Sequence, residues 1–534
     1  MHVWTGAATN MCFTADPIPL KRLKSLFSSA LLPEHTFMGR PQGLLWLFVS
    51  FFSAFTAIAQ PGASVAAWSQ LLEKLEQSPG FSAAQVGFSL MQPDGQVLFG
   101  YQDQRAFLPA STLKAVVCAA ALDIFGPDHR FQTTLLVDGT VQDSVLQGNV
   151  WLVGQGDPSL GSNRAGLPGA EALLKEWVSA VRAAGISRIS GQVIGDGRFY
   201  GAPEVPGGWA WDDMSNYYAP VLTGLSFDEN RSFLTFKTPA QVGAPTVLLS
   251  VKPNLPGWLW VNECRSGSPG SGDQCYLYAA PGFKTIYARG TLPAGQSEFS
   301  VEGAWPDPDL AAAQRLLLAL QAAGIAVEQG AASALLTPEA SGFSPEWKAR
   351  PEMVREIWVG YSPALRDLVR WTNEKSLNSY AESFLRALGQ QTGNPSVDGG
   401  RRALAAWLKE RPRIAETGWN LDDGSGLSRR NTVTPLGMAN IMVWSQRQSW
   451  ADAFYQSLPL SGQSGTLRNL MPEAPGRIAA KSGSLSGTRA YAGFVNGRSG
   501  QRYPFCVIVN NAETGSPALR TALEPLFNAM LALP

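Results

Sequence analysis

Several stretches of the chain have apolar residues at the three-to-four-residue spacing of a helix. Proline is well placed to begin some of these stretches and glycine to end them, as at Pro109 and Gly126. The helices predicted in this way are residues 68–77, 109–126, 169–184, 309–325 and 516–531.

Other stretches have the patterns of strands. Residues 86–101, VGFSLMQPDGQVLFGY, predict a hairpin with an Asp-Gly turn. Strands separated by Gly and Pro turns are predicted from Phe131 to Leu160, another at VIGDG, and a β-rich block from Leu225 to Glu302. After about residue 350 the pattern is mainly helical until the last strands.

The last strands have an unusual composition. Residues 481–493, KSGSLSGTRAYAG, predict a small-residue strand that begins with lysine, and YPFCVIVNN predicts its hydrophobic partner after the turn GRSGQR. A strand of Ser and Gly packs poorly, so it suits a place where another backbone comes close, such as a peptide added to a sheet edge. The alternative is an ordinary turn with a solvated lysine.

Composition limits the classes of protein that fit. The chain has 534 residues, of which 45% are hydrophobic and 16% charged, so it is globular and long enough for two or more domains. Its formal net charge is +0 and it has no long run of Lys or Arg. A nucleic-acid partner is therefore not expected, because such binding depends on neutralising phosphates.

The N-terminal region predicts export. Residues 43–59 are apolar and uncharged, follow Arg40, and end in Ala57-Ile58-Ala59, which is the small-x-small pattern of a signal-peptidase site. We therefore expect residues 1–59 to be an N-terminal extension and signal peptide that is cleaved near Ala59. A membrane anchor is the competing interpretation, and a loose membrane association stays open.

Export affects how the cysteines are interpreted. Cys264 and Cys275 bracket the Gly/Ser-rich loop RSGSPGSGDQ, and a short loop closed in an oxidising compartment predicts a disulfide between them. Cys118 and Cys506 lie in apolar runs, where cysteine behaves as a small buried hydrophobe.

Histidine is too scarce for two common kinds of site. The chain has only His2, His35 and His129, and the first two precede the predicted cleavage point. A Ser-His-Asp triad or a His-rich zinc site would rest on His129 alone, so no metal or other cofactor is expected. A serine enzyme of this composition needs another base, and a desolvated lysine near a second cation can serve.

The run LPASTLKAVVCAAALDIFGP, residues 108–127, contains such a pair. Ser111 and Lys114 are three residues apart in the first turn of the predicted helix, so they share one face. The free N–H groups at a helix start also favour negative charge developing beside Ser111. Alone, this S-x-x-K pattern fits a surface lysine on a core helix better than a reactive pair, because it occurs by chance in many proteins of this size.

Two further motifs follow in the chain. Ser376-Leu377-Asn378 supplies S-x-N, and Lys481-Ser482-Gly483 supplies K-[ST]-G. In this order the three motifs resemble those of the penicillin-binding proteins and serine β-lactamases. Leu377 replaces the commoner aspartate and Ser482 the commoner threonine; neither change removes a reacting group.

More of the chain is similar to one branch of these proteins, the D-alanyl-D-alanine carboxypeptidase/endopeptidase family of low-molecular-mass penicillin-binding proteins. This branch has a large insert between the first two motifs, and the resemblance covers essentially the whole predicted mature chain. The runs that carry it are GQGDP from Gly154, PGGWAWDDMSNYYAP from Pro206, DDGSGLSRRNTVTP from Asp422 and LPLSGQSGTLRN from Leu458.

The resemblance implies an α/β (α+β) transpeptidase fold of the penicillin-binding-protein/β-lactamase type. We expect an antiparallel sheet with helices on both faces, formed by residues 60–130 and 350–534. Residues 131–349 would be an inserted region with one or two nested α/β and β-rich domains, part of which, near 200–220, would return to the active site.

The resemblance also implies residue roles. Ser111 would be the nucleophile and Lys114 its base, while Ser376 would relay a proton and Asn378 would hold the substrate amide. The N–H groups of Ser111 and Ser484 would form the oxyanion hole.

Substrate contacts are implied at a second group of residues. Lys481 and the segment Ser482, Gly483 and Ser484 would bind the terminal carboxylate of the substrate. Asp213, with Asp212 as the alternative, would face the amino end of the third stem-peptide residue. Arg429 matches an arginine near the site, although a basic surface loop explains it almost as well.

The function implied is that of a periplasmic serine D,D-carboxypeptidase, D,D-endopeptidase or both. It would act on the D-Ala-D-Ala stem peptides and cross-bridges of peptidoglycan, with β-lactam antibiotics as covalent inhibitors. A serine β-lactamase is one alternative, although no E-x-x-L-N-like segment follows Asn378. A catalytically weak cell-wall binding module is another, but such a module has no need of two lysines placed around serines.

Overall fold

The computed structural model describes residues 65–164, 166–336 and 346–534. The chain divides into two units, Met1–Ala59 and Gln60–Pro534, and the structure is described here for the second. The predicted signal peptide lies outside the described residues. Within the described ranges, no helix combines the length and the apolar character needed to cross a membrane.

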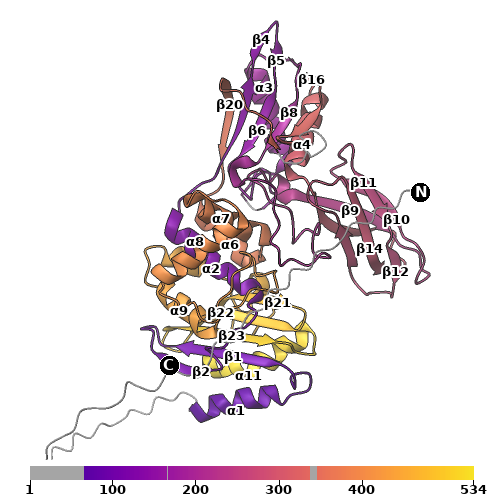
Figure 1. Ribbon diagram of the computed structural model, residues 1–534. Coiled ribbons are helices and arrows are strands. Elements are labelled where there is room, and N and C mark those ends of the chain that lie inside the picture. The colour runs from indigo at the N-terminus through magenta and orange to yellow at the C-terminus, as the bar shows by residue number, and fades with distance from the viewer. Residues whose placement is uncertain (1–64, 165, 337–345) are drawn as a thin grey trace, which may run out of the picture. The chain divides into compact units, whose positions relative to one another are not determined.

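The centre of the part expected from residues 60–130 and 350–534 is a five-stranded antiparallel sheet with the order β2-β1-β23-β22-β21 (Figure 1). The hairpin predicted at residues 86–101 forms its first two strands, and β1 pairs with β23, so the two ends of the described chain meet in one sheet. The strands are β1 (Gln85–Met91), β2 (Val97–Tyr101), β21 (Ile478–Leu485), β22 (Thr488–Asn496) and β23 (Arg502–Asn510).

The small-residue segment differs from the prediction of a single strand over residues 481–493. The chain reverses at Ser486 and Gly487, so this segment supplies two paired strands, with Leu485 opposite Thr488. Gly487 has a φ of +71°, which a glycine adopts without the steric cost that a side chain would impose. The first of these strands is the edge strand β21.

Helices cover both faces of this sheet, as Figure 1 shows. Alternate residues of β23 supply the two cores: Phe505 and Val507 pack with α1 and α11, whereas Cys506 and Ile508 pack with the larger helical group. The helices on the first face are α1 (Val65–Glu76) and α11 (Ser516–Leu531). Those of the larger group are α2 (Leu113–Phe125), α6 (Leu365–Lys375), α7 (Asn378–Gln391), α8 (Val397–Glu410), α9 (Pro435–Ser445) and α10 (Ala451–Ser457).

The inserted region contains a second five-stranded sheet, with the order β17-β8-β6-β3-β20. Helices α3 (Ala170–Ala183) and α4 (Pro308–Ala322) bury Trp177 and Leu316 against it. The strands are β3 (Gln132–Asp138), β6 (Val150–Gly154), β8 (Val193–Asp196), β17 (Ala331–Ser333) and β20 (Val354–Tyr361). A smaller sheet has the order β16-β7-β5-β4, with β4 (Thr140–Gln142), β5 (Val145–Gln147), β7 (Arg188–Ile189) and β16 (Ala326–Val327).

Strand β20 moves one predicted domain boundary. Residues 350–534 were expected to form one part with residues 60–130, but Val354–Tyr361 pairs antiparallel with β3. The inserted region therefore extends beyond residue 349 to Tyr361, because its sheet needs this strand to cover the edge of β3.

The remainder of the insert is rich in strands, as the pattern from Leu225 to Glu302 predicts. One sheet has the order β10-β9-β15, and in the other β11 and β12 run parallel to β14 while β13 pairs with it antiparallel. The strands are β9 (Arg231–Lys237), β10 (Val247–Lys252), β11 (Leu259–Asn262), β12 (Arg265–Gly267), β13 (Gln274–Tyr278), β14 (Thr285–Pro293) and β15 (Phe299–Ala304). A two-stranded sheet joins β18 (Leu335–Leu336) to β19 (Glu346–Trp347).

The cysteines lie in these cores. Cys118 and Cys506 are fully buried thiols, as predicted, and burial raises the pKa of both. Cys264 and Cys275 are also thiols in this structure, with their sulfur atoms 2.9 Å apart. A disulfide is closer, at about 2.05 Å. The proximity supports the predicted disulfide, which stays a prediction.

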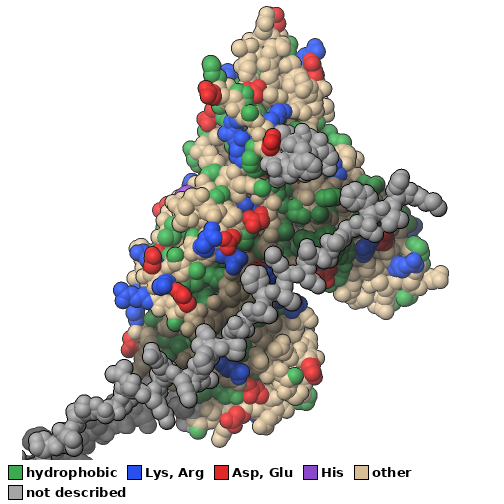
Figure 2. Space-filling model, in the orientation of Figure 1, with side chains coloured by type: hydrophobic (Ala, Val, Ile, Leu, Met, Phe, Trp, Pro, Cys, Tyr) green, Lys and Arg blue, Asp and Glu red, His purple; other side chains and the backbone are tan. Residues whose placement is uncertain are grey.

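Charge is balanced on the surface as well as in the sequence. The chain has 42 basic and 42 acidic residues, and on the face in view neither sign forms a continuous field (Figure 2).

Candidate active site

Ser111 and Lys114 lie at the start of α2, in contact with each other. Residues Ala110–Thr112 form a single 3₁₀ turn that leads into the helix. Lys114 donates from Nζ to Ser111 Oγ at 2.8 Å. Ser111 is half-buried, whereas Lys114 is fully buried, so the pair has a solvent-accessible serine in front of a desolvated amine.

The second partner of Lys114 is the backbone carbonyl of Ser425, at 2.6 Å. Burial lowers the pKa of Lys114 to about 8, although the nearby carboxyl groups of Asp423 and Glu382 oppose this effect. The sequence predicted that desolvation and a second cation would together lower this pKa; burial is the cause that lowers the pKa of Lys114, and burial together with the charge effect between the two lysines lowers the pKa of Lys481.

Asp423 holds the loop that carries Ser425. Its carboxylate accepts hydrogen bonds from the N–H groups of Gly426 and Ser428 and from the side chain of Asn431, each at 2.7 Å. Trp209 of the inserted region also donates to it, from Nε1 at 2.9 Å. The loop is therefore fixed from both parts of the chain.

A second buried acid, Glu382 of α7, holds the same loop. It accepts from the N–H groups of Gly424, at 3.0 Å, and Ser425, at 2.7 Å. Burial raises the pKa of Glu382 to about 8, and the charge of Asp423 adds to the shift. Sequence reasoning did not assign Glu382, Asp423 or Ser425 to the site; the only signal was the run DDGSGLSRRN, rich in turn-forming residues.

Two glycines let this loop and β21 approach the start of α2. A Cβ on Gly426, whose φ is +77°, would lie 1.9 Å from the carbonyl oxygen of Ala110. A Cβ on Gly483 would lie 2.6 Å from the carbonyl oxygen of Pro109. Both separations are far inside van der Waals contact, so these positions require glycine.

Ser376 and Asn378 lie at the junction between α6 and α7. Ser376 caps α6 in the left-handed conformation, with a φ of +60°, and its Oγ accepts from Lys481 Nζ at 3.0 Å. Asn378 begins α7 and donates from Nδ2 to the carbonyl oxygen of Tyr218 at 2.7 Å. The S-x-N motif therefore contacts both the K-S-G motif and the inserted region.

Lys481 is fully buried on the edge strand β21. Burial and the charge of Lys114 hold the pKa of Lys481 well below its usual range. The neighbouring Ser482 donates from Oγ to Thr466 Oγ1 at 2.7 Å, and exposed Ser484 accepts from Arg489 at 3.1 Å. The three motifs thus meet at one place, and Thr466 and Arg489 are additional residues there.

Asp213 and Arg429 lie beside this cluster. Tyr218 donates from its hydroxyl to Asp213 Oδ1 at 3.0 Å. Burial raises the pKa of Asp213, the charge of Asp212 raises it further, and the positive charge of Arg429 lowers it. Asp212 and Arg429 are exposed, whereas Asp213 is half-buried.

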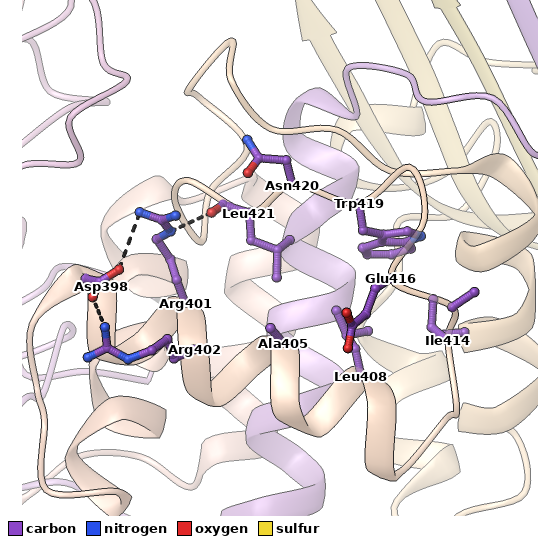
Figure 3. A pocket seen from close by; sticks show the side chains of 11 residues that line it. Asp398, Arg401, Arg402, Ala405, Leu408, Ile414, Glu416, Trp419, Asn420 and Leu421 are labelled. Carbon is purple, nitrogen blue, oxygen red and sulfur yellow. Dashed lines mark hydrogen bonds and ion pairs between the residues drawn. The ribbon is translucent and has the colours of Figure 1, made fainter. Parts of the chain in front are cut away.

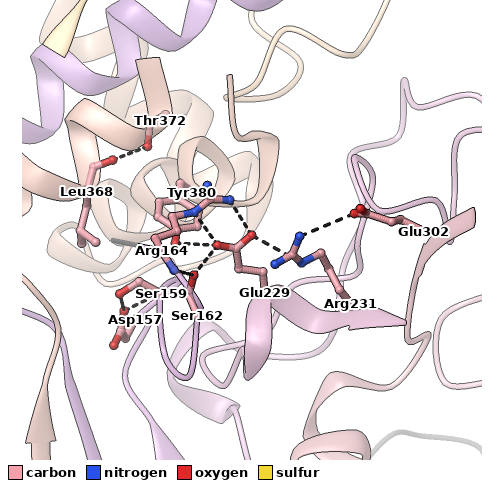
Figure 4. Close-up of polar contacts among 10 residues, drawn as sticks. All are labelled: Asp157, Ser159, Ser162, Arg164, Glu229, Arg231, Glu302, Leu368, Thr372 and Tyr380. Carbon is pink, nitrogen blue, oxygen red and sulfur yellow. Dashed lines mark hydrogen bonds and ion pairs between the residues drawn. The ribbon is translucent and has the colours of Figure 1, made fainter. Parts of the chain in front are cut away.

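A buried polar network connects the insert to α7 (Figure 4). Glu229 accepts from Ser162 Oγ at 2.7 Å and from the hydroxyl of Tyr380 at 3.1 Å, and it forms an ion pair with Arg164. Tyr380 follows Asn378 by two residues. The network therefore fixes the first turn of α7, and with it the S-x-N motif.

A cavity of about 270 Å³ lies elsewhere, between α8 and the loop that leads to Leu421. Figure 3 shows Trp419 and Ile414 on one side and Arg401 and Arg402 beside Asp398 on the other. None of the three motifs lines it, so the reacting groups are not here.

His129 is the one histidine in the described part of the chain. The centroid of its ring lies 5.0 Å from the ring centroids of Phe125 and Phe131. His129 therefore packs between aromatic rings just after the end of α2. In the same part of the chain, no group of three or more His, Cys, Asp or Glu side chains is placed to hold a metal ion.

Comparisons with known proteins agree on one family. Residues 68–530 match the D-Ala-D-Ala carboxypeptidase 3 (S13) family. A D-alanyl-D-alanine carboxypeptidase of Actinomadura sp. (strain R39) is 27% identical over 480 residues, which cover 86% of this chain and 83% of that protein. The D-alanyl-D-alanine carboxypeptidase DacB of Haemophilus influenzae is 24% identical over 471 residues, covering 86% of this chain and 91% of that protein.

A solved structure supports the fold. The crystal structure of penicillin binding protein 4 (dacB) from Haemophilus influenzae superposes with a TM-score of 0.72 at 23% identity, over 87% of this chain and 99% of that one. This likeness confirms the predicted fold class: an antiparallel sheet with helices on both faces and inserted β-rich parts.

The close approach at Gly426 gives a test of the site geometry. We expect Gly426→Ala to lower the reactivity of Ser111 towards an activated acyl ester by about 100-fold, because a small displacement of reacting groups has that effect. Gly500→Ala is the matched control: its φ is +84°, but a Cβ there meets open space. Gly500→Ala should lose about 1–2 kcal/mol of stability from the left-handed backbone alone, whereas Gly426→Ala should lose more because its Cβ also meets the Ala110 carbonyl; denaturant unfolding measures both losses. Equal reactivity in the two would contradict this geometry.

Proposed function

Because the chain belongs to the D-Ala-D-Ala carboxypeptidase 3 (S13) family, we propose that Ser111 is the nucleophile with which it acts as a serine D,D-carboxypeptidase. The observation that carries this assignment is the 2.8 Å contact between Ser111 Oγ and Lys114 Nζ, in which the lysine is fully buried. With a pKa of about 8, roughly a fifth of Lys114 is neutral near physiological pH, and this neutral form can accept the serine proton.

Acylation follows from this pair. Ser111 Oγ attacks the carbonyl carbon of the penultimate D-alanine while Lys114 takes its proton. The C–N bond to the terminal D-alanine then breaks, the leaving amine gains a proton, and the peptide remains as an ester on Ser111. Water hydrolyses this ester in a second step, which restores the serine.

Ser376 and Lys481 would return the proton. The hydroxyl of Ser376 contacts Lys481, whose pKa is lowered, so a proton can pass through this pair to the leaving amine. Asn378 would hold the substrate amide. The 2.7 Å hydrogen bond from Asn378 to Tyr218 supports this role, because it fixes the orientation of the side-chain amide.

Two backbone N–H groups, those of Ser111 and Ser484, would form the oxyanion hole. A Cβ built on Gly483 would lie only 3.1 Å from the nitrogen of Ser111, so β21 lies directly beside the start of the helix. This closeness supports the role. Each donor of this kind contributes about 10²–10³ in rate. Lys481, Ser482, Gly483 and Ser484 would bind the terminal carboxylate, with Arg489 as a further cation beside Ser484.

The third residue of the stem peptide would meet Asp213. A carboxylate there favours a side chain that ends in a free amino group, such as that of meso-diaminopimelate or lysine. Arg429 lies near enough to affect the charge of Asp213 and would orient the same end of the peptide. The export signal predicted at residues 43–59 supports action in the periplasm, on peptidoglycan stem peptides and also on cross-bridges.

Benzylpenicillin tests the nucleophile. We expect the intact mass of the protein to increase by one drug molecule within minutes and to keep the adduct, because the acylated serine is hydrolysed slowly. Ser111→Ala should form no adduct, whereas Ser486→Ala, which changes an exposed serine on the neighbouring hairpin, should form it normally. Penicillin consumed without a lasting adduct would indicate a β-lactamase, and no adduct with intact drug would indicate a binding module.

The pH dependence of acylation tests Lys114. The pKa of Lys114 lies at about 8, below its usual value, so its neutral form increases as pH rises. The acylation rate should therefore rise from pH 6, reach half of its maximum at about pH 8 and become constant about one to two pH units above that. Lys114→Ala should acylate about 10²–10⁴-fold more slowly. Lys375→Ala, which changes an exposed lysine beside Ser376, is the control and should acylate at the wild-type rate. A similar decrease in this control would contradict the assignment of Lys114 as the base.

Asp213→Ala tests the specificity assignment. The wild-type protein should prefer pentapeptides with a free amino group on the third residue over the same peptides with that group acetylated. We expect the variant to reduce this ratio of kcat/KM values by about twofold to fivefold, as for a partly exposed charge pair. Asp212→Ala is the control, and it should have the same ratio of kcat/KM values as the wild-type protein. If Asp212→Ala loses this preference, the role belongs to Asp212.

A further inference from the structure

Four aromatic side chains face solvent on the insert beside the site: Trp211, Tyr276, Tyr278 and Tyr287, here called the aromatic surface. Trp211 is 56% exposed, Tyr276 38% and Tyr287 36%, and Tyr278 is half-buried. Large aromatic side chains usually contribute to cores, so a group of them on one outer face indicates a binding surface.

Strand register places three of these rings on one face of the sheet. Tyr278 of β13 lies opposite Tyr287 of β14, and Tyr276 lies opposite Arg289. The intervening residues Leu277 and Ala288 point into the core, as the alternation along both strands requires. One face of the sheet therefore packs against the core, and the opposite face carries the aromatic surface.

Neighbouring groups extend this surface. The ring of Trp211 lies 6.4 Å from that of Tyr278, and the guanidinium of Arg289 lies 5.0 Å from the ring centre of Tyr287. Arg289 also forms an ion pair with Glu263. Flat apolar rings are thus bordered by charged groups that can bind hydroxyl and amide groups.

Hydrogen bonds connect the aromatic surface firmly to the active site. Asn216 donates to the carbonyl oxygens of Asp212 and Asp213, at 2.7 and 2.9 Å, and accepts from the N–H of Leu277 on β13 at 3.1 Å. A few residues further on, the carbonyl of Tyr218 accepts from Asn378. The segment from Trp211 to Tyr218 therefore holds β13 at a fixed distance from the catalytic serines.

We propose that the aromatic surface binds the glycan strand to which the stem peptides of the substrate are attached; this proposal rests on the function proposed above. Sugar rings present flat C–H faces that stack on aromatic rings, and their equatorial hydroxyls bind charged groups such as Asp212, Glu263 and Arg289. Continuity with the active site selects this occupant, because a stem peptide held at Asn378 and Asp213 brings its own glycan to the adjoining surface.

The first experiment measures binding without catalysis. A β-1,4-linked N-acetylglucosamine tetramer is titrated into the Ser111→Ala protein, and the tryptophan fluorescence is followed together with the heat of binding. Saturable binding is expected. Trp211→Ala and Tyr287→Ala, each introduced into the Ser111→Ala protein, should weaken it by about threefold to tenfold, the contribution expected of one ring contact. Tyr361→Ala in the same background is the matched control, since Tyr361 is 62% exposed but lies on β20 in another sheet.

The second experiment measures D-alanine release from one pentapeptide in two forms, free and attached to un-cross-linked glycan strands. The wild-type protein should have an about tenfold higher kcat/KM on the attached form. Tyr287→Ala should lose most of this advantage through KM while its kcat/KM on the free peptide stays unchanged, and Tyr361→Ala should change neither.

The two proposals fail separately. If the free pentapeptide is not hydrolysed, the proposed function is wrong, whereas tetramer binding by the Ser111→Ala protein still tests the surface. If the tetramer does not bind, or attached and free peptides are hydrolysed equally well, the glycan proposal is overturned.

Discussion

The burial of Lys114 is the constraint on which the site depends. A pKa of about 8 means that the surroundings favour the neutral amine by about 3 kcal/mol relative to water. This amine needs acceptors in fixed positions, and Ser111 Oγ and the carbonyl of Ser425 supply them. The Ser425 carbonyl is fixed in turn by Glu382 and Asp423. Two buried acids thus act through a backbone loop on a lysine, without touching it.

The central sheet brings the three motifs together. Ser111 comes before the insert, Ser376 after it, and Lys481 lies on the edge strand near the C-terminus. Because β21 is the last strand of its sheet, its outer edge is available to other segments. Residues 459–461 pair with this edge as far as Ala480, and an extended peptide would therefore pair with the part that begins at Lys481. Small residues on β21 serve two needs: they allow contact with the start of α2, and they leave room for a second backbone.

Local patterns in the sequence predicted much of this arrangement. The Ser111–Lys114 spacing predicted their contact because both lie within one helical turn, and the predicted helix over residues 516–531 agrees with α11. The turn at Ser486 and Gly487 was missed because one glycine among many small residues gives no distinct signal. Glu382, Thr466 and Tyr218 were missed because their roles depend on contacts between segments far apart in the chain. Strand β20 was assigned to the wrong part for the same reason, since only its partner β3 identifies its sheet.

The pairing of β1 with β23 has a consequence for how the protein is made. Gln85 lies opposite Asn510, so more than four hundred residues separate the two halves of the central sheet, and the insert lies between them. A nascent chain can fold the insert early, but it receives Lys481 and the last two strands only at the end of synthesis. Ser111, Lys114 and Lys481 therefore cannot come together before the chain is essentially complete, so the order of synthesis itself delays assembly of the site until the last strands have formed.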